Sequence, residues 1–422
     1  MIDLTLLRED PDRVAAALAR RGLTRDDVDR LVELDVRRRE LVLAVDTARA
    51  EQNTASKAIG AATPDDRPTL IERASQLKAR TAELEGELET AGAELDRALA
   101  GVPNLPHPDA PDGDEGDGVV LRTVGERPTF DFEPRDHVEL LEGRDALDLA
   151  RGAKVSGARF AFLKGDAALL ELALVRYAIE VAGRHGHVPV LPPVLVREAA
   201  MYGTGFLPTD EQQIFRTDDR DDLYLVGTAE VPIAGMHLDE ILDPADLPLR
   251  YVGFSTCFRR EAGSAGRDTR GIFRVHQFDK VELFSFVAPD RSDEEHERIL
   301  AVEEEILGGL GLHYQVVDIP VGDLGASAAR KFDIEGWLPG QEAFRELTSC
   351  SNTTDYQARR LRCRIDNPDG ANPLVHTLNG TALAVPRTII AVVETHQQAD
   401  GSVAVPPALQ PHLGREVLLP AG

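Results

Sequence analysis

Cysteine is scarce in this chain of 422 residues, and long apolar runs are absent. The three cysteines, Cys257, Cys350 and Cys363, form no CxxC pair, which argues against a disulfide framework and a four-cysteine zinc site. No stretch reaches eighteen consecutive apolar residues, and the N-terminus has no apolar run of signal-peptide length. We therefore expect a soluble, untargeted protein of a reducing cytoplasm, without a membrane partner.

Basic residues are also in short supply. Lys and Arg total 47 against 73 Asp and Glu, a formal net charge of −26, which opposes binding of a polyanion over the whole surface. The imbalance is uneven, because residues 101–120 hold five acidic and no basic side chains, whereas residues 28–100 hold 15 acidic and 11 basic ones. Local basic faces are compatible with this distribution, for example at Arg37, Arg38 and Arg39, although a solvated helix face explains each arginine equally well.

The first hundred residues predict helices. Asp10 as N-cap, Pro11 in the first turn and Gly22 as a stop mark a first short helix. Two longer helices follow, separated by the Gly- and Pro-containing turn at residues 60–68. At 1.5 Å per residue, about 30 residues each give a hairpin of about 45 Å, an arm too thin for a broad core of its own.

The two long helices have the alternating three-and-four spacing of a coiled coil. The a and d positions are Leu31, Leu34, Arg38, Leu41, Val45, Ala48, Gln52 and Ala55 in the first helix and Leu70, Ala74, Leu77, Thr81, Leu84, Leu88, Ala91 and Leu95 in the second. This pattern predicts that the helices pack against each other along a single seam.

Beyond the arm the sequence changes character. Residues 102–120 are dense in Pro, Gly and Asp and predict a linker, so we expect an N-terminal domain at 1–101, carrying the arm at about 28–100, and a second domain at 121–422. In the second domain, β-branched runs at 275–287 and 313–320 alternate with helical stretches such as 167–186. Strands that neighbour one another across turns predict an α+β fold with a mixed or antiparallel sheet. The missing P-loop and GxGxxG motifs argue against a Walker or Rossmann nucleotide site.

The densest basic cluster lies at residues 254–284. Two strand-like segments flank a basic loop, residues 262–271, which predicts an antiparallel hairpin. Guanidinium groups offer paired donors to phosphate oxygens, and a ring such as Phe278 can stack on a base, so the hairpin could clamp a polyphosphate; an exposed, salt-bridged hairpin is the alternative. Its arginines are Arg259, Arg260, Arg267, Arg270 and Arg274, with Glu261, His276 and Glu282 among them.

Two further polar segments lie downstream. Glu346 and Ser349 are three apart, and a bulge or turn in an extended strand would let their oxygens converge on a divalent cation such as Mg²⁺; polar surface residues explain them as well. At residues 375–394 a polar turn, Asn-Gly-Thr, precedes an apolar helix with Arg387 at its beginning. An arginine on a rigid element of this kind indicates a binding role.

These segments resemble the signatures of the seryl-tRNA synthetases, a class II family of bacterial type. Residues 258–282 resemble motif 2, residues 376–387 resemble motif 3, and residues 226–230 and 346–360 resemble two further signatures of the family. Residues 185–196 look like class II motif 1, which implies a homodimer. The similarity runs through essentially the whole chain, arm included. It implies a largely antiparallel sheet of six or seven strands flanked by helices, with an N-terminal coiled-coil arm.

The resemblance also implies an activity: serine reacts with ATP to give seryl-adenylate and pyrophosphate, and the seryl group passes to tRNA(Ser), with tRNA(Sec) as a further candidate. The arm would reach the tRNA, Mg²⁺ would accompany ATP, and neither zinc nor DNA is expected. The resemblance implies that the catalytic residues are Arg259, Glu346 and Arg387, and that Glu346 and Ser349 bind Mg²⁺. The implied ATP-binding residues are Arg259, Arg260, Glu261, Arg274, Val275, Phe278, Glu346, Leu347, Thr348, Ser349 and Arg387. The implied serine-binding residues are Thr228, Ala229, Glu230, Arg259, Glu282, Asn379 and Thr381.

The chain departs from the family at motif 3, which often reads NGS and has a glycine before the arginine. Thr381 and Pro386 stand at those places, and since threonine keeps the hydroxyl we expect its role to survive. Other functions remain open. A paralogue that charges a carrier protein or another small amino acid is expected to lack the arm, and a non-catalytic RNA-binding protein is expected to lose Arg259, Glu346 or Arg387. A structural coiled coil explains residues 28–100 but nothing after 180.

Overall fold

The computed structural model describes residues 1–218, 220–262 and 270–419. These form two compact units, Ile2–Leu105 and Pro106–Gly422, the second including Met1. The division falls inside the segment 102–120 that the sequence analysis treats as a linker. Most of the predicted basic loop, with Arg267, lies outside the described residues. No helix in the described part of the chain combines the length and hydropathy of a membrane span.

The N-terminal unit is entirely helical. Its helices are α1 Leu4–Glu9, α2 Pro11–Ala19, α3 Arg25–Ala61 and α4 Arg67–Ala100. Asp10 caps α2 by accepting a hydrogen bond from the Arg13 amide, with Pro11 in the first turn, as predicted, but α1 precedes it and makes it the second helix. Thr24 and Asp27 form a reciprocal capping box that begins α3.

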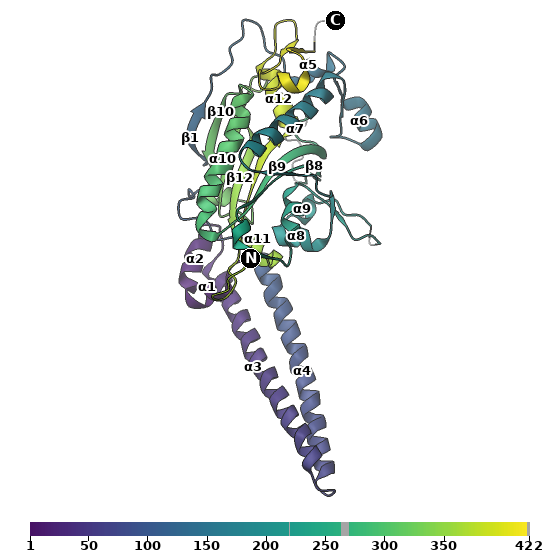
Figure 1. The fold of residues 1–422 in the computed structure, drawn as a ribbon, viewed down its shortest axis with the longest axis vertical. Helices are drawn as coiled ribbons and strands as arrows, with labels where there is room; N and C mark the ends of the chain where they lie inside the picture. The colour runs from purple at the N-terminus through teal and green to yellow at the C-terminus, as the bar shows by residue number, and fades with distance from the viewer. Residues whose placement is uncertain (219, 263–269, 420–422) are drawn as a thin grey trace. The chain divides into compact units, whose positions relative to one another are not determined.

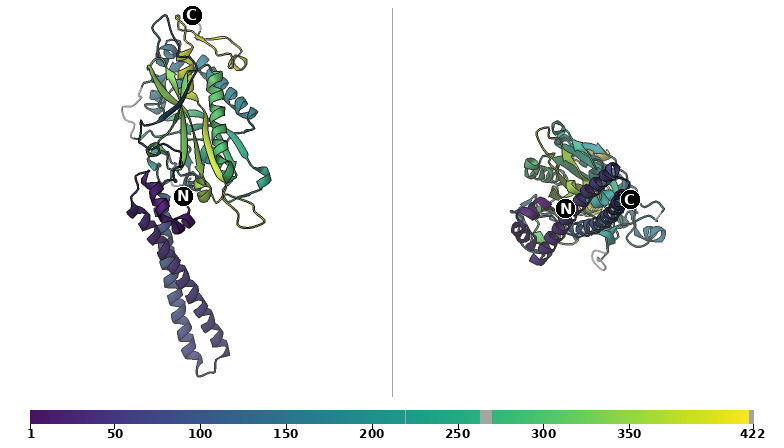
Figure 2. Two further views of the ribbon diagram at one scale, coloured as in Figure 1. Left: turned by 90° about the vertical axis from the view of Figure 1, so that its left-hand side faces the viewer. Right: turned by 90° about the horizontal axis from the view of Figure 1, so that it is seen from below.

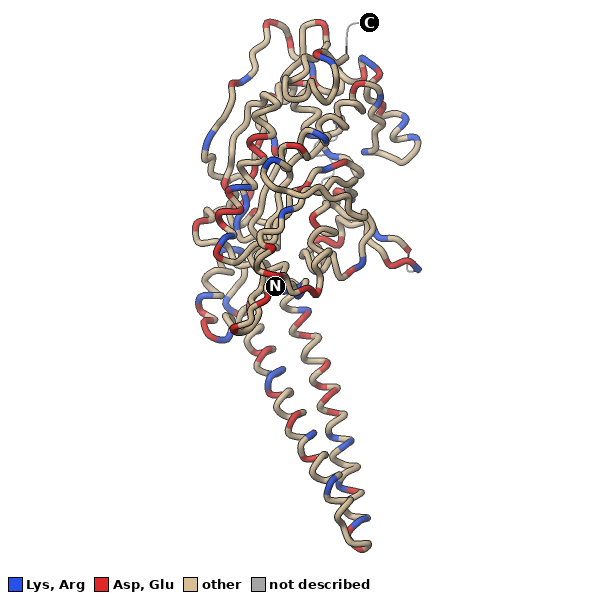
Figure 3. The backbone as a smooth tube through the Cα atoms, viewed as in Figure 1, with Lys and Arg blue, Asp and Glu red and all other residues tan. Residues whose placement is uncertain are grey.

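Helices α3 and α4 lie side by side (Figures 1 and 2) and pack along the predicted seam. The fully buried seam residues are Leu31, Val45 and Ala48 of α3 and Leu77, Thr81, Leu84, Ala91 and Leu95 of α4. The other predicted a and d residues are half-buried, which confirms the heptad pattern. Arg37 pairs with Glu94 and Arg49 with Glu85 across the helices, and both signs of charge are interspersed along the arm (Figure 3).

The C-terminal unit is built on an eight-stranded sheet in the order β1-β10-β11-β12-β14-β9-β8-β4. Its strands are β1 Val119–Val124, β4 Val188–Val190, β8 Leu249–Phe258, β9 Gln277–Val287, β10 Tyr314–Asp318, β11 Arg330–Leu338, β12 Ala343–Thr354 and β14 His376–Ala384. All neighbours are antiparallel except β4 and β8. The predicted antiparallel character is confirmed, whereas the predicted count of six or seven strands is too low.

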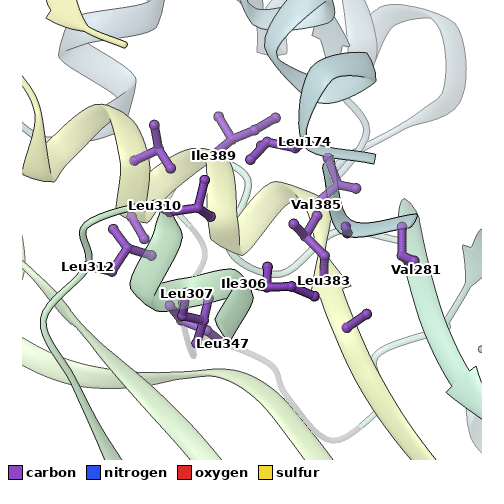
Figure 4. Close-up of a cluster of buried hydrophobic side chains, with 14 of the residues drawn as sticks. Leu174, Val281, Ile306, Leu307, Leu310, Leu312, Leu347, Leu383, Val385 and Ile389 are labelled. Atoms are coloured by element: carbon purple, nitrogen blue, oxygen red, sulfur yellow. The ribbon is translucent and has the colours of Figure 1, made fainter. Parts of the chain in front are cut away.

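Three long helices cover one face of this sheet (Figure 1): α7 Asp166–Arg184, α10 Ser292–Gly309 and α12 Val385–Thr395. Their apolar faces meet in the core, where Leu174 of α7, Ile306 of α10 and Ile389 of α12 are fully buried (Figure 4). Along β9, Val281 and Leu283 join this core, and the alternation of a strand turns Lys280 and Glu282 to the other face.

Shorter elements complete the unit. The helices are α5 His137–Glu142, α6 Leu149–Ser156, α8 Glu198–Thr204, α9 Glu230–Gly235, α11 Tyr356–Leu361 and α13 Gln410–Leu413. Two-stranded pairs join β2 Leu147–Asp148 with β3 Phe162–Leu163, β5 Leu195–Val196 with β6 Tyr224–Leu225, β7 Ile241–Leu242 with β13 Arg364–Ile365, and β15 Val403–Ala404 with β16 Val417–Leu418.

The elements predicted for the second domain are largely confirmed. The runs at 275–287 and 313–320 correspond to β9 and β10, and the helical stretch at 167–186 corresponds to α7. The predicted turn at Asn-Gly-Thr is wrong, because these residues lie inside β14, where Asn379 pairs with Ser351 of β12 and Phe284 of β9. Pairing on both sides of a central strand overrides the local turn preference of Asn-Gly.

Candidate active site

A cavity of about 370 Å³ lies against the sheet face opposite α7 and α10, walled by strands β9, β11, β12 and β14, by the segment that follows β8 and by the start of α12. The predicted hairpin is confirmed, since β8 and β9 pair in antiparallel register from Leu249 with Phe286 to Phe258 with Gln277. Of the residues assigned from the sequence, the cavity is lined by Thr228, Glu230, Arg259, Glu261, Arg274, Val275, Phe278, Glu282, Glu346, Leu347, Ser349, Asn379, Thr381 and Arg387.

A β-bulge explains how Glu346 and Ser349 reach the same cavity. In a regular strand, residues three apart point to opposite faces of a sheet. The register of β11 with β12 shifts here, so that Ile334 pairs with Thr348 and Glu335 with Glu346, which leaves Leu347 unmatched. The extra residue turns Glu346 to the face of Ser349, as the sequence analysis required of a strand with a bulge.

Arg259 lies at the end of β8 and faces the cavity. Its Nε donates to the Gly227 carbonyl oxygen at 3.3 Å, and its guanidinium lies 5.3 Å from the centre of the Phe278 ring. Its backbone is held by His276, whose carbonyl accepts from the Arg259 amide at 3.0 Å. The backbone of the arginine is therefore fixed, and its side chain lines the cavity.

Arg387, in the first turn of α12, contacts the bulged strand. Its Nη1 donates to the Glu346 carbonyl oxygen at 2.9 Å and lies 3.1 Å from Glu346 Oε2. Burial acts to raise the pKa of Glu346, but the charges of Arg387 and Lys331 outweigh it and bring the pKa to about 2. Glu346 is thus a carboxylate throughout the physiological range.

Glu261 and Arg274 close the same part of the cavity. Arg274 Nη1 donates to Glu261 Oε2 at 3.2 Å. Glu261 has a φ of 50°, in the left-handed region that a residue with a side chain seldom adopts. Arg274 and Glu261, together with Arg259 and Arg387, also line an adjoining cavity of about 330 Å³, so both cavities open onto the arginines.

The opposite part of the cavity carries buried carboxyl groups. Glu230 Oε1 accepts from Gln357 Nε2 at 2.7 Å and from Asn379 Nδ2 at 2.8 Å. Burial and the neighbouring charge of Glu282 raise the pKa of Glu230 to about 7, and burial likewise raises the pKa of Glu282. Lys280 forms an ion pair with Glu282. An extra cation beside these carboxyl groups would be stabilised by them.

Three assigned residues have side chains elsewhere. Arg260 Nε donates to the Ile214 carbonyl oxygen at 2.8 Å, with its guanidinium 4.8 Å from the centre of the Phe215 ring. Ala229 is fully buried in an apolar cluster behind the cavity. The hydroxyl of Thr348 donates to Glu303 Oε2 at 3.1 Å, because the alternation of the strand turns this side chain away from the face of Ser349 and toward α10. The structure therefore does not bring these side chains to the cavity.

Other residues line the cavity without having been assigned from the sequence. They are Phe206, Phe273, Lys280, Lys331, Ala384 and Pro386. Four of them lie within the motif segments but were not assigned a role there: Phe273, Lys280, Ala384 and Pro386. Lys331 could have been suggested by the alternation of β11, whereas nothing in the sequence around Phe206 indicates a binding role.

Two oxygen donors, Glu346 and Ser349, are available for a metal ion. No group of three or more His, Cys, Asp or Glu within the described ranges could hold one. Mg²⁺ commonly binds through one or two protein ligands and completes its octahedron with waters and phosphate oxygens. An ionised Glu346 beside a serine hydroxyl fits such a phosphate-bound ion better than a closed protein cage.

Comparisons with known proteins agree with this geometry. The Seryl-tRNA synthetase N-terminal domain matches residues 1–106, and the tRNA synthetase class II core domain (G, H, P, S and T) matches residues 214–396. The chain is 52% identical to the serine–tRNA ligase of Nocardia farcinica over 420 residues, covering 100% of both chains. It is 54% identical to that of Streptomyces coelicolor over 424 residues, covering 100% of this chain and 99% of the relative. The crystal structure of seryl-tRNA synthetase from Pyrococcus horikoshii complexed with ATP has a TM-score of 0.93 at 42% identity, covering 100% of both chains.

Proposed function

The chain belongs to the seryl-tRNA synthetase family and is a serine–tRNA ligase, and from this premise we propose how the cavity carries out its chemistry. The observation that supports the proposal is the separation of charge inside one cavity. Arg259, Arg274 and Arg387 line both this cavity and the adjoining one, whereas Glu230 and Glu282 line only the first. The arginines suit a polyphosphate, and the carboxyl groups suit the ammonium group of an amino acid.

ATP occupies the arginine part. Phe278 stacks on the adenine, Arg259 binds the α-phosphate, and Arg387 holds the γ-phosphate end. A carboxylate oxygen of serine attacks the α-phosphorus in line, the bond from this phosphorus to the bridging oxygen breaks, and pyrophosphate leaves with the electron pair. Arg259 stabilises the negative charge that develops on the α-phosphoryl oxygens, so catalysis consists mainly of positioning and electrostatic stabilisation.

Mg²⁺ accompanies the nucleotide. Glu346 and Ser349 would supply its protein ligands. When bound, the ion neutralises phosphate charge. The low pKa of Glu346 keeps this ligand ionised, while the contact between Arg387 and Glu346 links the metal ligand to the γ-phosphate ligand.

Serine occupies the carboxylate part. Glu230 and Glu282 receive its ammonium group, and Thr228 and Thr381, which line the same cavity, hydrogen-bond its hydroxyl. A site that hydrogen-bonds a hydroxyl discriminates against alanine and glycine by about 10⁴-fold, because its own polar groups are otherwise left unpaired. Threonine must be excluded by volume.

The arm serves the second step, transfer of the seryl group to tRNA(Ser). A two-helix arm with scattered Arg and Lys suits recognition of RNA by shape and by backbone contacts. The family resemblance adds tRNA(Sec) to the proposal as a second substrate, which the arm would recognise through the same kinds of contact. We propose the cytoplasm as the place of the reaction, because translation consumes charged tRNA there.

A homodimer is part of the proposal. Val188 and Leu191, in the segment that resembles motif 1, are 57% and 80% exposed, and Leu195 is 41% exposed. A row of exposed aliphatic side chains beside the edge strand β4 is typical of an interface between subunits. The mass of the protein in solution, measured by light scattering, tests it against a Leu191→Glu variant that is expected to be monomeric.

Amino-acid-dependent exchange of pyrophosphate into ATP tests the activation step. Serine, threonine, alanine, glycine and cysteine are compared without tRNA, and serine is repeated with Arg259→Ala. We expect strong exchange with serine alone and its loss in the variant. Exchange with no amino acid by a folded, ATP-binding protein would favour a regulatory RNA-binding protein, and better exchange with another amino acid would overturn the substrate.

A further inference from the structure

The polypeptide returns to the cavity through residues 270–274, which we call the return limb. Its first residues are held by the beginning of α5. Arg270 Nε donates to Asp136 Oδ2 at 2.6 Å, and the Ile272 amide donates to His137 Nε2 at 3.4 Å. Since His137 is only 3% exposed, the second of these contacts lies in the protein interior.

The following residues of the limb reach the ligand cavity. The Phe273 ring lies 4.7 Å from the guanidinium carbon of Arg387 and 4.3 Å from that of Arg345. Arg274 donates to Glu261. Phe273, Arg274 and Val275 all line the cavity, so the position of Ile272 determines where three consecutive ligand-facing residues begin.

Behind His137 stands Glu394, a fully buried residue near the end of α12, which contacts α5 (Figure 1). Its Oε1 accepts from the His137 amide and lies 3.0 Å from His137 Nδ1, and its Oε2 accepts from the Gly340 amide at 2.9 Å. Because the Glu394 carboxylate can only accept hydrogen bonds, the imidazole proton lies on Nδ1. Nε2 is then free to accept the hydrogen bond from the Ile272 amide.

Gly271 shows how closely the limb approaches this histidine. A Cβ atom at this position would lie 1.9 Å from His137 Nε2, and the residue has a φ of +71°. Both facts exclude an ordinary side chain. The contact between the limb and His137 therefore depends on glycine at 271 as well as on the imidazole.

We propose that His137 and Glu394 are positioning residues for the reaction: Glu394 orients the imidazole, and the imidazole sets the return limb so that Phe273 and Arg274 meet ATP correctly. Glu394 and Arg387 lie seven residues apart on α12, about two helical turns. One rigid helix thus carries the γ-phosphate ligand at its start and the anchor of the return limb near its end. The inference rests on the proposed ATP site.

The test separates the two bonds of the imidazole. His137→Asn retains a donor toward Glu394 but loses the acceptor for Ile272, whereas His137→Gln retains an acceptor near the Nε2 position. In serine-dependent pyrophosphate exchange we expect His137→Asn to raise KM for ATP roughly tenfold, with KM for serine within about twofold of the native value, and His137→Gln to recover most of the loss. The KM for serine is expected to remain unchanged because the proposed serine ligands lie on other segments.

The control is His396→Asn. His396 lies at the end of the same helix and bonds the Leu310 carbonyl oxygen at 2.8 Å, so its loss disturbs α12 without touching the return limb. A general loss of packing would lower the thermal midpoint and the active fraction in both histidine variants, without an ATP-specific change in KM. An equal ATP-specific rise in His396→Asn would overturn the inference.

Gly271→Ala provides a second route if His137→Asn does not fold. It leaves α5 and α12 intact and displaces the limb from His137, so we expect the same ATP-specific rise in KM. Unchanged KM values for ATP in Gly271→Ala and in every folded His137 variant, or parallel rises for ATP and serine, would contradict the positioning role. If the native enzyme itself shows no serine-dependent exchange, the proposed function fails first; if it is active and the variants match it, only this inference fails.

Discussion

The arm and the C-terminal unit differ in the sequence separation of the contacts that determine their structures. In the arm, two helices pack along one seam, and a heptad repeat read along each helix names the buried residues. In the catalytic unit, the cavity joins residues from 206 to 387, carried on strands paired across long intervals. The arm is therefore a spacer whose length can change while its structure persists. The cavity, in contrast, depends on the exact positions of individual side chains.

The electrostatics of the two regions differ in the same direction. In the arm, the pair of Arg49 and Glu85 is 58% and 43% exposed, so water screens it. In the cavity, burial raises the pKa of Glu230 to about 7, and the charges of Arg387 and Lys331 bring that of Glu346 to about 2 despite its burial. Charge in the arm is a surface property, whereas burial and charge together set the protonation states of the proposed ligand-binding groups in the cavity.

The largest effect is expected from Arg387→Ala. The substitution removes the proposed γ-phosphate ligand together with its contacts to Phe273 and Glu346, so exchange should fall about 10³-fold. Binding of tRNA through the arm should stay within about twofold, which filter binding can measure. A parallel loss of tRNA affinity would mean that the two regions do not act separately.

Shortening the arm is the reciprocal experiment, with a loss of about 10²-fold expected in aminoacylation. Residues 46–83 are replaced by a short Gly-Ser linker, which retains the packing of Leu41, Val45, Leu84 and Leu88. Serine-dependent exchange should remain within about twofold, because every proposed ligand lies in the other unit. Loss of exchange in the shortened enzyme would show that the arm contributes to activation.

Sequence and structure agree most closely where the interactions are local. The heptads of the arm, the cap at Asp10 and the strands β9 and β10 follow from periodicity and turn residues alone. The turn predicted at Asn379 is wrong because that segment pairs with strands on both sides. Strand β1, Val119–Val124, escaped prediction because it begins inside the segment whose Pro, Gly and Asp content indicated a linker.

For the site, the motif segments named most of the residues that line the cavity, but not the direction of each side chain. Glu346 and Ser349 are three residues apart, and only the bulge at Leu347 brings both to the cavity face, while Thr348 between them reaches Glu303. Phe206 reaches the cavity from a segment outside every motif. Such features depend on long-range pairing, which a single sequence does not display.

The pH dependence of serine binding should give an effect of about tenfold. With a pKa of about 7, Glu230 is mostly protonated at pH 6 and mostly ionised at pH 8, so KM for serine should fall about tenfold across this interval. The empty enzyme should correspondingly lose stability as the pH rises through 7, because the pKa is raised above its unfolded value. Exchange kinetics at four pH values measure the first effect.

Glu230→Gln is the control for that titration. The amide cannot ionise, so KM for serine should be high and nearly independent of pH, while KM for ATP should vary little in either protein. A native KM for serine that is flat between pH 6 and 8 would contradict the assignment of the ammonium group to Glu230.

The smallest effect belongs to the arm and completes the contrast. A double-mutant cycle with Arg49→Ala and Glu85→Ala should give a coupling energy below about 1 kcal/mol, because both side chains are partly exposed and must be ordered to meet. The coupling should shrink further in 1 M salt, where the Debye length is about 3 Å. Thermal unfolding of the four proteins measures it. A larger, salt-resistant coupling would mean that the arm depends on specific charge pairs as the cavity does, and that its seam alone does not account for its structure.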